Sequence, residues 1–143
     1  MDKQNCELNR RLCVAFPMLR QAYDENVSWQ FGDRTGSHVV YGDVLNPYIR
    51  NALASRDLAT LKKVGSFIEE ILALNSSYGE EVITVSVIEH FLDDADQELF
   101  RECLGAQGSS IFDNLKRWYR DNQAKLTQFA KHGSIGCRKG FEL

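Results

Sequence analysis

The stretch that decides the fold is EEVITVSVIEHFLDDADQE, residues 80–98, with seven acidic residues, one histidine and a centre rich in valine and isoleucine. A half-buried β-strand would alternate apolar and polar residues with a period of two. Val82 and Ile88 break that alternation, because they place apolar side chains on the face that should be polar. The pattern therefore favours a helix over a strand.

Helical spacing accounts for all of these apolar residues. One face would hold Val82, Val85, Ile88 and Leu92, and Ile83, Val87 and Phe91 would broaden it. The β-branched residues lower the intrinsic helix propensity, but they do not change the period. A helix apolar over so much of its circumference is usually buried among other helices. The acidic residues would remain outside.

The rest of the chain also shows helical periodicity. Further helices are expected over residues 5–16, 17–29, 43–53, 55–75, 93–105 and 109–133. Six to seven helices joined by short loops predict an all-α protein, either a compact bundle or a short solenoid-like array. We expect one domain over residues 1–143, with 132–143 as a flexible tail, since glycines crowd its end.

Several residues indicate where these helices begin or end. Pro17 suits the first turn of the second helix, Asp43 an N-cap, and Ser55 or Asp57 the next N-cap. A short extended segment is expected at residues 38–41. Gly105 would close the short helix, and Ser109 or Ser110 would cap the last one.

Two helices have predicted inner faces, and one has an unusual glycine. The second helix should bury Met18, Leu19, Ala22 and Tyr23. The last helix should bury Ile111, Leu115, Trp118, Tyr119, Leu126 and Phe129. Gly65 lies inside the helix expected at residues 55–75, where glycine is unfavourable, so it suggests a close crossing by a neighbouring helix.

Composition is that of a soluble globular protein, with 43% hydrophobic and 26% charged residues. No apolar run is long enough to span a bilayer, and charges in the opening residues do not fit a secretory signal, so we expect a cytoplasmic protein. The four cysteines form no C-x-x-C pair and are interpreted as reduced structural thiols.

Charge is distributed unevenly along the chain. Residues 66–104 contain one Lys/Arg and ten Asp/Glu, a balance of −9. Residues 1–65 contain nine against seven (+2), and residues 105–143 contain seven against three (+4). The acidic centre would repel nucleic acid and attract a basic protein. The basic-aromatic sequence LKRWYR, residues 115–120, is assigned to the core rather than to RNA binding.

Metal chemistry finds little support in the spacing. Glu89 and His90 are adjacent and point about 100° apart on a helix, and the three histidines show no H-x-x-x-H spacing. The aspartates at 93, 94 and 96 lack the glycine and closing glutamate of a calcium loop. They could instead start the next helix, where its dipole favours acids, or dock a partner. No catalytic residue, cofactor or metal is predicted.

Five segments carry a resemblance to a known class of proteins: FPMLRQAYDE, YGDVLNPYIRNAL, VGSFIEEI, VITVSVIEHFL and CLGAQGSSIFDNL. Together, over residues 16–120, they resemble the small helical bacterial immunity proteins of polymorphic and contact-dependent toxin systems. This resemblance implies a cytosolic, non-catalytic protein that binds and neutralises a toxin domain, and that is a monomer apart from the toxin complex.

Such a toxin is commonly a basic nuclease, which suits an acidic surface. The predicted partner-binding residues are Tyr78, Glu80, Glu81, Glu89, Asp93, Asp94, Asp96 and Glu98, with Tyr78 as an aromatic anchor at the edge. Two alternatives remain open at this point: a carboxylate-based metal-dependent enzyme, and a helical adaptor unrelated to toxins.

Overall fold

The computed structural model describes residues 1–131, and within them the side chains of residues 1–123. The described residues contain seven continuous helical runs of seven residues or more, some divided into α, 3₁₀ and π segments, one separate three-residue 3₁₀ turn, η2 (Gly32–Arg34), and no β-strand. The runs are α1 (Asp2–Ala15), η1 (Pro17–Leu19) with α2 (Arg20–Val27), α3 (Ser37–Val40) with η3 (Tyr41–Leu45) and α4 (Asn46–Ala54), α5 (Leu58–Ala73), α6 (Ser77–Glu81) with η4 (Val82–Val87) and η5 (Ile88–Phe91), α7 (Gln97–Cys103) and α8 (Ala106–Lys131). The prediction of an all-α protein with six to seven helices is confirmed.

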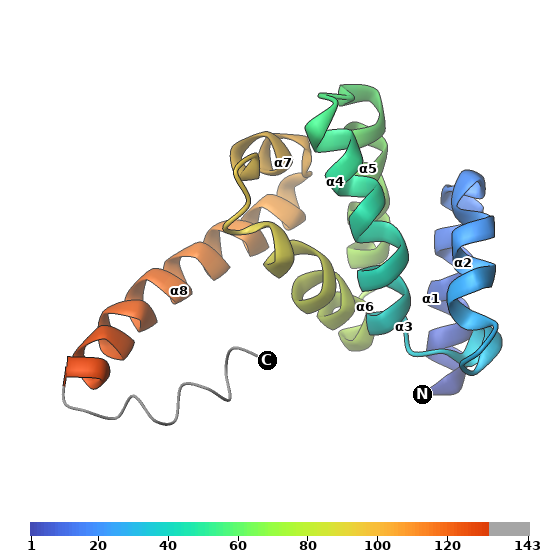
Figure 1. Cartoon of the computed structure of the whole chain (residues 1–143), viewed down its shortest axis with the longest axis horizontal. Helices are drawn as coiled ribbons and strands as arrows, with labels where there is room; N and C mark the ends of the chain where they lie inside the picture. The colour runs from blue at the N-terminus through green and yellow to red at the C-terminus, as the bar shows by residue number, and fades with distance from the viewer. Residues whose placement is uncertain (132–143) are drawn as a thin grey trace. The chain divides into compact units, whose positions relative to one another are not determined.

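Contacts divide the chain into two units, Met1–Phe112 and the residues from Asp113 onward. The first unit contains the whole acidic segment. Within it, α4 and α5 pack side by side, as the green ribbons of Figure 1 show. The predicted flexible tail, residues 132–143, lies outside the described residues.

The third helical run begins earlier than the sequence suggested. Figure 1 shows α3, η3 and α4 as one continuous ribbon, so the extended segment predicted at residues 38–41 is wrong, and Asp43 lies inside the run instead of capping it. Pro47 cannot donate a backbone hydrogen bond, and its ring crowds the carbonyl one turn earlier. The wider π turn of η3 directly precedes it and accommodates this defect.

The stretch at residues 80–98 is helical as far as Phe91, which confirms the helix prediction for its first part. Its inner face differs in detail, because Val85 is 45% exposed while Ser86 is buried. The π segment η4 is the reason: a wider turn rotates later residues relative to a regular α-helix. The predicted apolar face assumed one α period throughout.

The two π segments lie against each other. The buried side chain of Asn46, just after η3, donates a hydrogen bond of 2.7 Å to the carbonyl oxygen of Ser86 in η4. The other side-chain atom of Asn46, Oδ1, is buried with no hydrogen-bond partner in the protein. A tight helix crossing is therefore joined by one buried amide.

Helix α5 is a central element of the first unit. Its buried residues include Leu61, Val64, Phe67, Ile68, Ile71 and Leu72, and Asp57 caps its start by accepting from the backbone N–H of Thr60. A Cβ added to Gly65 would lie 1.8 Å from the backbone oxygen of Cys103 in α7. The expectation that Gly65 marks a close helix crossing is confirmed.

The second run begins with Pro17 in its first turn, as predicted. Leu19 and Tyr23 are buried, but Met18 is exposed and so is Ala22. The expected inner face is therefore half right. The 3₁₀ turn η1 places residues three per turn rather than 3.6, which changes the direction of Met18 relative to the helix that follows.

The last helix starts at Ala106, so neither Ser109 nor Ser110 caps it, and Leu104 rather than Gly105 ends α7. The backbone N–H groups of Gln107 and Gly108, in the first turn of the helix, have no acceptor within it. They donate instead to the carboxylate of Glu69, at 3.1 and 2.7 Å. A residue of α5 thus performs the capping expected from a local serine.

The predicted inner face of the last helix is also wrong in part. Phe112 is buried instead, with its ring tilted by 48° against that of Phe100 and the centroids 6.3 Å apart, while Trp118 and Tyr119 are exposed. The residues after Phe112 belong to the second unit. The side chains of Leu126 and Phe129 lie outside the described residues.

Candidate protein-interaction site

The predicted acidic residues lie between residues 80 and 98, here called the acidic run, and occupy two places in the first unit. Glu80 and Glu81 lie in α6, and the others follow from η5 into α7. Glu89 lies eight positions after Glu81 along the helical run, roughly 12 Å along the axis. Glu80, Glu81, Asp93 and Glu98 are exposed, whereas Glu89, Asp94 and Asp96 are half-buried. The acids therefore extend along one helical run and its following turn rather than forming one tight cluster.

Two of the aspartates stabilise the turn between η5 and α7. The Asp94 carboxylate accepts a hydrogen bond of 2.8 Å from the backbone N–H of Asp96. Asp96 in turn forms an ion pair of 2.8 Å with Arg56, the residue just before the α5 cap. Arg56 has a positive φ of 56°, so it adopts a left-handed backbone conformation at this position. These two acids have structural partners within the protein.

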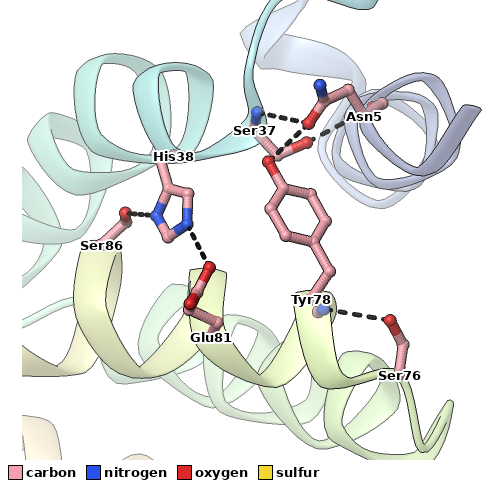
Figure 2. A network of polar contacts seen from close by, with 8 residues as sticks. Asn5, Ser37, His38, Ser76, Tyr78, Glu81 and Ser86 are labelled. Carbon is pink, nitrogen blue, oxygen red and sulfur yellow. Dashed lines mark hydrogen bonds and ion pairs between the residues drawn. The ribbon is translucent and has the colours of Figure 1, made fainter. Parts of the chain in front are cut away.

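Tyr78, which is half-buried, lies in a polar network with residues of α1 and α3. Figure 2 shows its hydroxyl reaching the side chain of Asn5, to which it donates at 2.6 Å. Its ring meets the His38 ring edge to face, with centroids 5.6 Å apart. Burial raises the pKa of Tyr78 above its usual value. The predicted edge anchor is thus part of an internal contact between helices.

His38 connects two residues of the acidic run. Its Nδ1 lies 2.5 Å from the Ser86 hydroxyl, and its Nε2 lies 3.0 Å from the Glu81 carboxylate, as Figure 2 shows. A serine, a histidine and an acid also form nucleophilic catalytic sites. Ser86, however, is only 6% exposed, so its hydroxyl is not open to a substrate in this conformation. Here the side chains of Ser86, His38 and Glu81 join α3 to the helical run at residues 77–91, which consists of α6, η4 and η5.

The same network contains residues that the sequence did not single out. Asn5 and Asn9, one turn apart on α1, are both buried. Asn9 donates to the backbone oxygens of Asp33 and Thr35 at 3.1 and 2.8 Å and accepts from the Ser37 hydroxyl at 2.9 Å. The i, i+4 spacing of two asparagines on the apolar side of α1 was a signal that could have identified them.

Two exposed aromatic residues were also missed. Trp29 is 81% exposed and Phe31 is 70% exposed, and both lie in the turn after α2. Burial of large aromatic side chains dominates many protein interfaces, where tryptophan is enriched among the residues that contribute most. The helix expected over residues 17–29 included Trp29, whereas α2 ends at Val27, so only Phe31, next to Gly32, had the sequence signal of a turn.

Within residues 1–131, the described side chains, those of residues 1–123, include no group of three or more His, Cys, Asp or Glu arranged to hold a metal ion. In that same range, none of the helices combines the length and apolar character needed to cross a bilayer. The three described cysteines, Cys6, Cys13 and Cys103, are free thiols.

The fold and this surface define a small all-α protein with a strongly acidic helical run. The chain belongs to the family DUF7674, described as a domain of unknown function, which matches residues 9–125. No curated protein and no solved structure matches the chain. The matched region includes the acidic run, the exposed aromatic turn and the polar network apart from Asn5.

Proposed function

We propose that this protein is a cytosolic immunity protein that binds and neutralises a cognate bacterial toxin domain through its acidic surface. The toxin would be a basic nuclease, and the contact would include Glu80, Glu81, Asp93 and Glu98. The half-buried Glu89, Asp94 and Asp96 would contribute charge at short range. The protein itself would be non-catalytic.

The observation that carries the proposal is the surplus of nine negative charges in residues 66–104. In the part of the chain that the structure describes, Glu80, Asp93 and Glu98 are exposed and take part in no ion pair. Unneutralised surface charge of one sign raises the association rate of an oppositely charged partner. It also repels the phosphate backbone that a nuclease would otherwise bind.

The exposed aromatic turn supports a protein partner. Charge alone gives fast but weak association, and a stable complex also needs buried apolar contacts. Trp29 and Phe31 would provide such contacts, since their side chains already face solvent in the free protein. Truncating Trp29 to Ala should therefore speed dissociation, whereas reversing surface acids should slow association.

The first experiment is co-purification with the C-terminal domain of the product of the gene immediately upstream, followed by a kinetic binding assay at several salt concentrations. The proposal expects a tight stoichiometric complex that abolishes the toxicity of that domain. Asp93→Lys combined with Glu98→Lys should slow association at low salt by on the order of tenfold. Both side chains are exposed, so the fold should not change.

A matched control reverses two acids elsewhere, Asp2→Lys with Glu25→Lys, which change net charge by the same amount. If both double variants lost association rate equally, the effect would come from net charge alone, and the acidic run would not be part of the interface. Failure to bind the upstream domain, with a different basic protein bound instead, would favour a helical adaptor. Stoichiometric metal in the purified protein would favour a metal-dependent enzyme.

A further inference from the structure

A groove of about 530 Å³ lies between α1 and α5. The buried rings of Phe16 and Phe67 form its floor, at 1% and 3% exposure. The two rings meet edge to face with centroids 5.3 Å apart. Val14 and Ala15 add apolar surface on the α1 side. The volume is within the range of small-molecule sites, which are concave and mostly apolar.

The rim of this groove is strongly basic. Arg10 and Arg11 stand on the α1 wall, Lys62 and Lys63 on the α5 wall, and Glu70 is the one acid among the lining residues. Glu7, on α1 beside the groove, pairs with both arginines at 3.6 and 3.0 Å. Four cations against two acids leave a net charge of +2 (4 − 2) around the groove.

We propose that this groove binds a small amphipathic organic anion. The apolar body would lie against Val14 and Ala15, above the buried rings of Phe16 and Phe67, and the carboxylate or phosphate head would lie between the arginines and the lysines. Cations on both walls can contact one anionic head together, and arginine supplies paired donors that match carboxylate and phosphate geometry. An apolar floor with a basic rim selects this class of ligand over a neutral apolar molecule or a simple inorganic anion.

This site is independent of the proposed toxin interface. Its charge is opposite to that of the acidic run, so a basic toxin surface would be repelled from it. The lining positions on α5, residues 62 to 70, span roughly 12 Å of helix. That length suits a body of one or two rings or a medium-length alkyl chain.

The test is a fluorescence titration of the intact protein with 8-anilinonaphthalene-1-sulfonate, an aromatic anion that brightens in apolar sites. We expect saturable binding of one probe per chain. Octanoate and octyl phosphate should displace it and thereby compare the two head groups, whereas 1-octanol, which has the same chain without the charge, should not. Equal displacement by 1-octanol would overturn the role of the basic rim.

Variants separate the groove from the rest of the surface. Lys62→Glu with Lys63→Glu should weaken probe binding at least tenfold, about 1.4 kcal/mol, since both side chains are exposed on one wall. The control Lys3→Glu with Arg20→Glu changes net charge equally outside the groove and should bind normally. Ser66→Trp, at an exposed lining position, should block the groove without charge change.

Normal binding by both groove variants would overturn the site. A glutamate hexapeptide that displaced the probe more strongly than octanoate would also overturn the proposal, because it would identify an acidic protein segment as the occupant. Circular dichroism of each variant would verify that the helical content is unchanged. None of these results depends on the toxin complex, so the two proposals can fail separately.

Discussion

Two contacts of the first unit hold chain segments together in opposite ways. Where α5 crosses α7, Gly65 allows the backbone of Cys103 to approach so closely that no side chain fits between them. Where α1 meets the loop before α3, Asn5 and Asn9 fill the space and hydrogen-bond to the loop backbone at residues 33–37. One contact depends on the absence of a side chain, and the other on the polar atoms of two side chains.

The comparison shows that equally tight contacts tolerate different changes. A backbone contact fails when any atom is added, because neither backbone can move without disturbing its helix. A buried amide contact fails when atoms are removed, because loop carbonyls are left without a donor. Substitutions that add an atom at the backbone contact, or remove polar atoms at the amide contact, should therefore separate the effect of shape from the effect of hydrogen bonding.

The largest effect is expected from Gly65→Ala, which should destabilise the protein by about 3 kcal/mol through overlap with the Cys103 carbonyl. Urea unfolding followed by circular dichroism measures it. Gly42→Ala is the matched control, since an added Cβ there meets nothing within 4 Å. That variant should be slightly stabilising, because alanine favours a helix. Equal effects at both positions would contradict the close crossing.

Asn9→Ala should have the next largest effect, about 2 kcal/mol, because two loop carbonyls lose their buried donor. Hydrogen exchange should localise the loss to residues 33–37 as faster exchange. Asn26→Ala removes an exposed amide that donates to Asp43 at 3.2 Å, and it should change stability by a few tenths of a kcal/mol at most. A large effect from Asn26 alone would contradict the importance of burial.

Tyr41→Phe should destabilise by about 1 kcal/mol, since the Tyr41 hydroxyl donates to the Leu8 carbonyl at 2.6 Å across the same α1 contact. Burial raises the pKa of Tyr41 above its usual value. The folded state therefore keeps this proton where the unfolded chain releases it. The contribution is complete below the unfolded pKa of about 10 and is lost as the pH rises further.

Unfolding measured from pH 8 to 12 tests that window. The wild-type protein should lose stability above about pH 10, and Tyr41→Phe should lose less over the same interval. Tyr48→Phe is a useful comparison, because within residues 1–131 its hydroxyl forms no described hydrogen bond. If the stability of Tyr41→Phe and that of the wild type fell in parallel at alkaline pH, titration of Tyr41 would not be the cause of the loss.

The smallest effect is expected at the start of α8. Glu69→Gln keeps one acceptor oxygen but weakens the cap on Gln107 and Gly108, so it should destabilise by about 0.5 to 1 kcal/mol. Glu70→Gln, on the next residue of α5 and exposed, should leave stability unchanged. If Glu70→Gln destabilised the protein more than Glu69→Gln, the role of Glu69 as the cap of α8 would be contradicted.

Much of the helical layout could be predicted from the sequence. The helical spacing of apolar residues identified α5 and the 77–91 run. Asp57 and Pro17 marked real helix starts, and Gly65 marked a real helix crossing. These signals are local, or depend on a single residue type, so they survive without knowledge of the neighbours. The predicted N-cap at Asp43 failed because the helical run already begins at Ser37. The one at Ser109 failed because the helix begins at Ala106, where the distant Glu69 carboxylate accepts from its N–H groups.

The candidate site was less predictable. Charge counting located the acidic run and identified Glu80, Asp93 and Glu98, which are exposed. It could not tell that Asp94 and Asp96 stabilise a turn or that Tyr78 bonds to Asn5, because those partners lie elsewhere in the chain. It also missed the exposed Trp29 and the basic groove, whose walls come from helices about 50 residues apart in the sequence.

Residue order alone was enough to establish an all-α protein with a strongly acidic middle, since helical period and charge are properties of neighbouring residues. Only the tertiary structure decided which polar residues are buried, which acids have partners and where a groove opens. Those properties depend on distances between segments that are far apart along the chain. The same asparagine or tyrosine can face solvent or join two helices, and packing makes that choice.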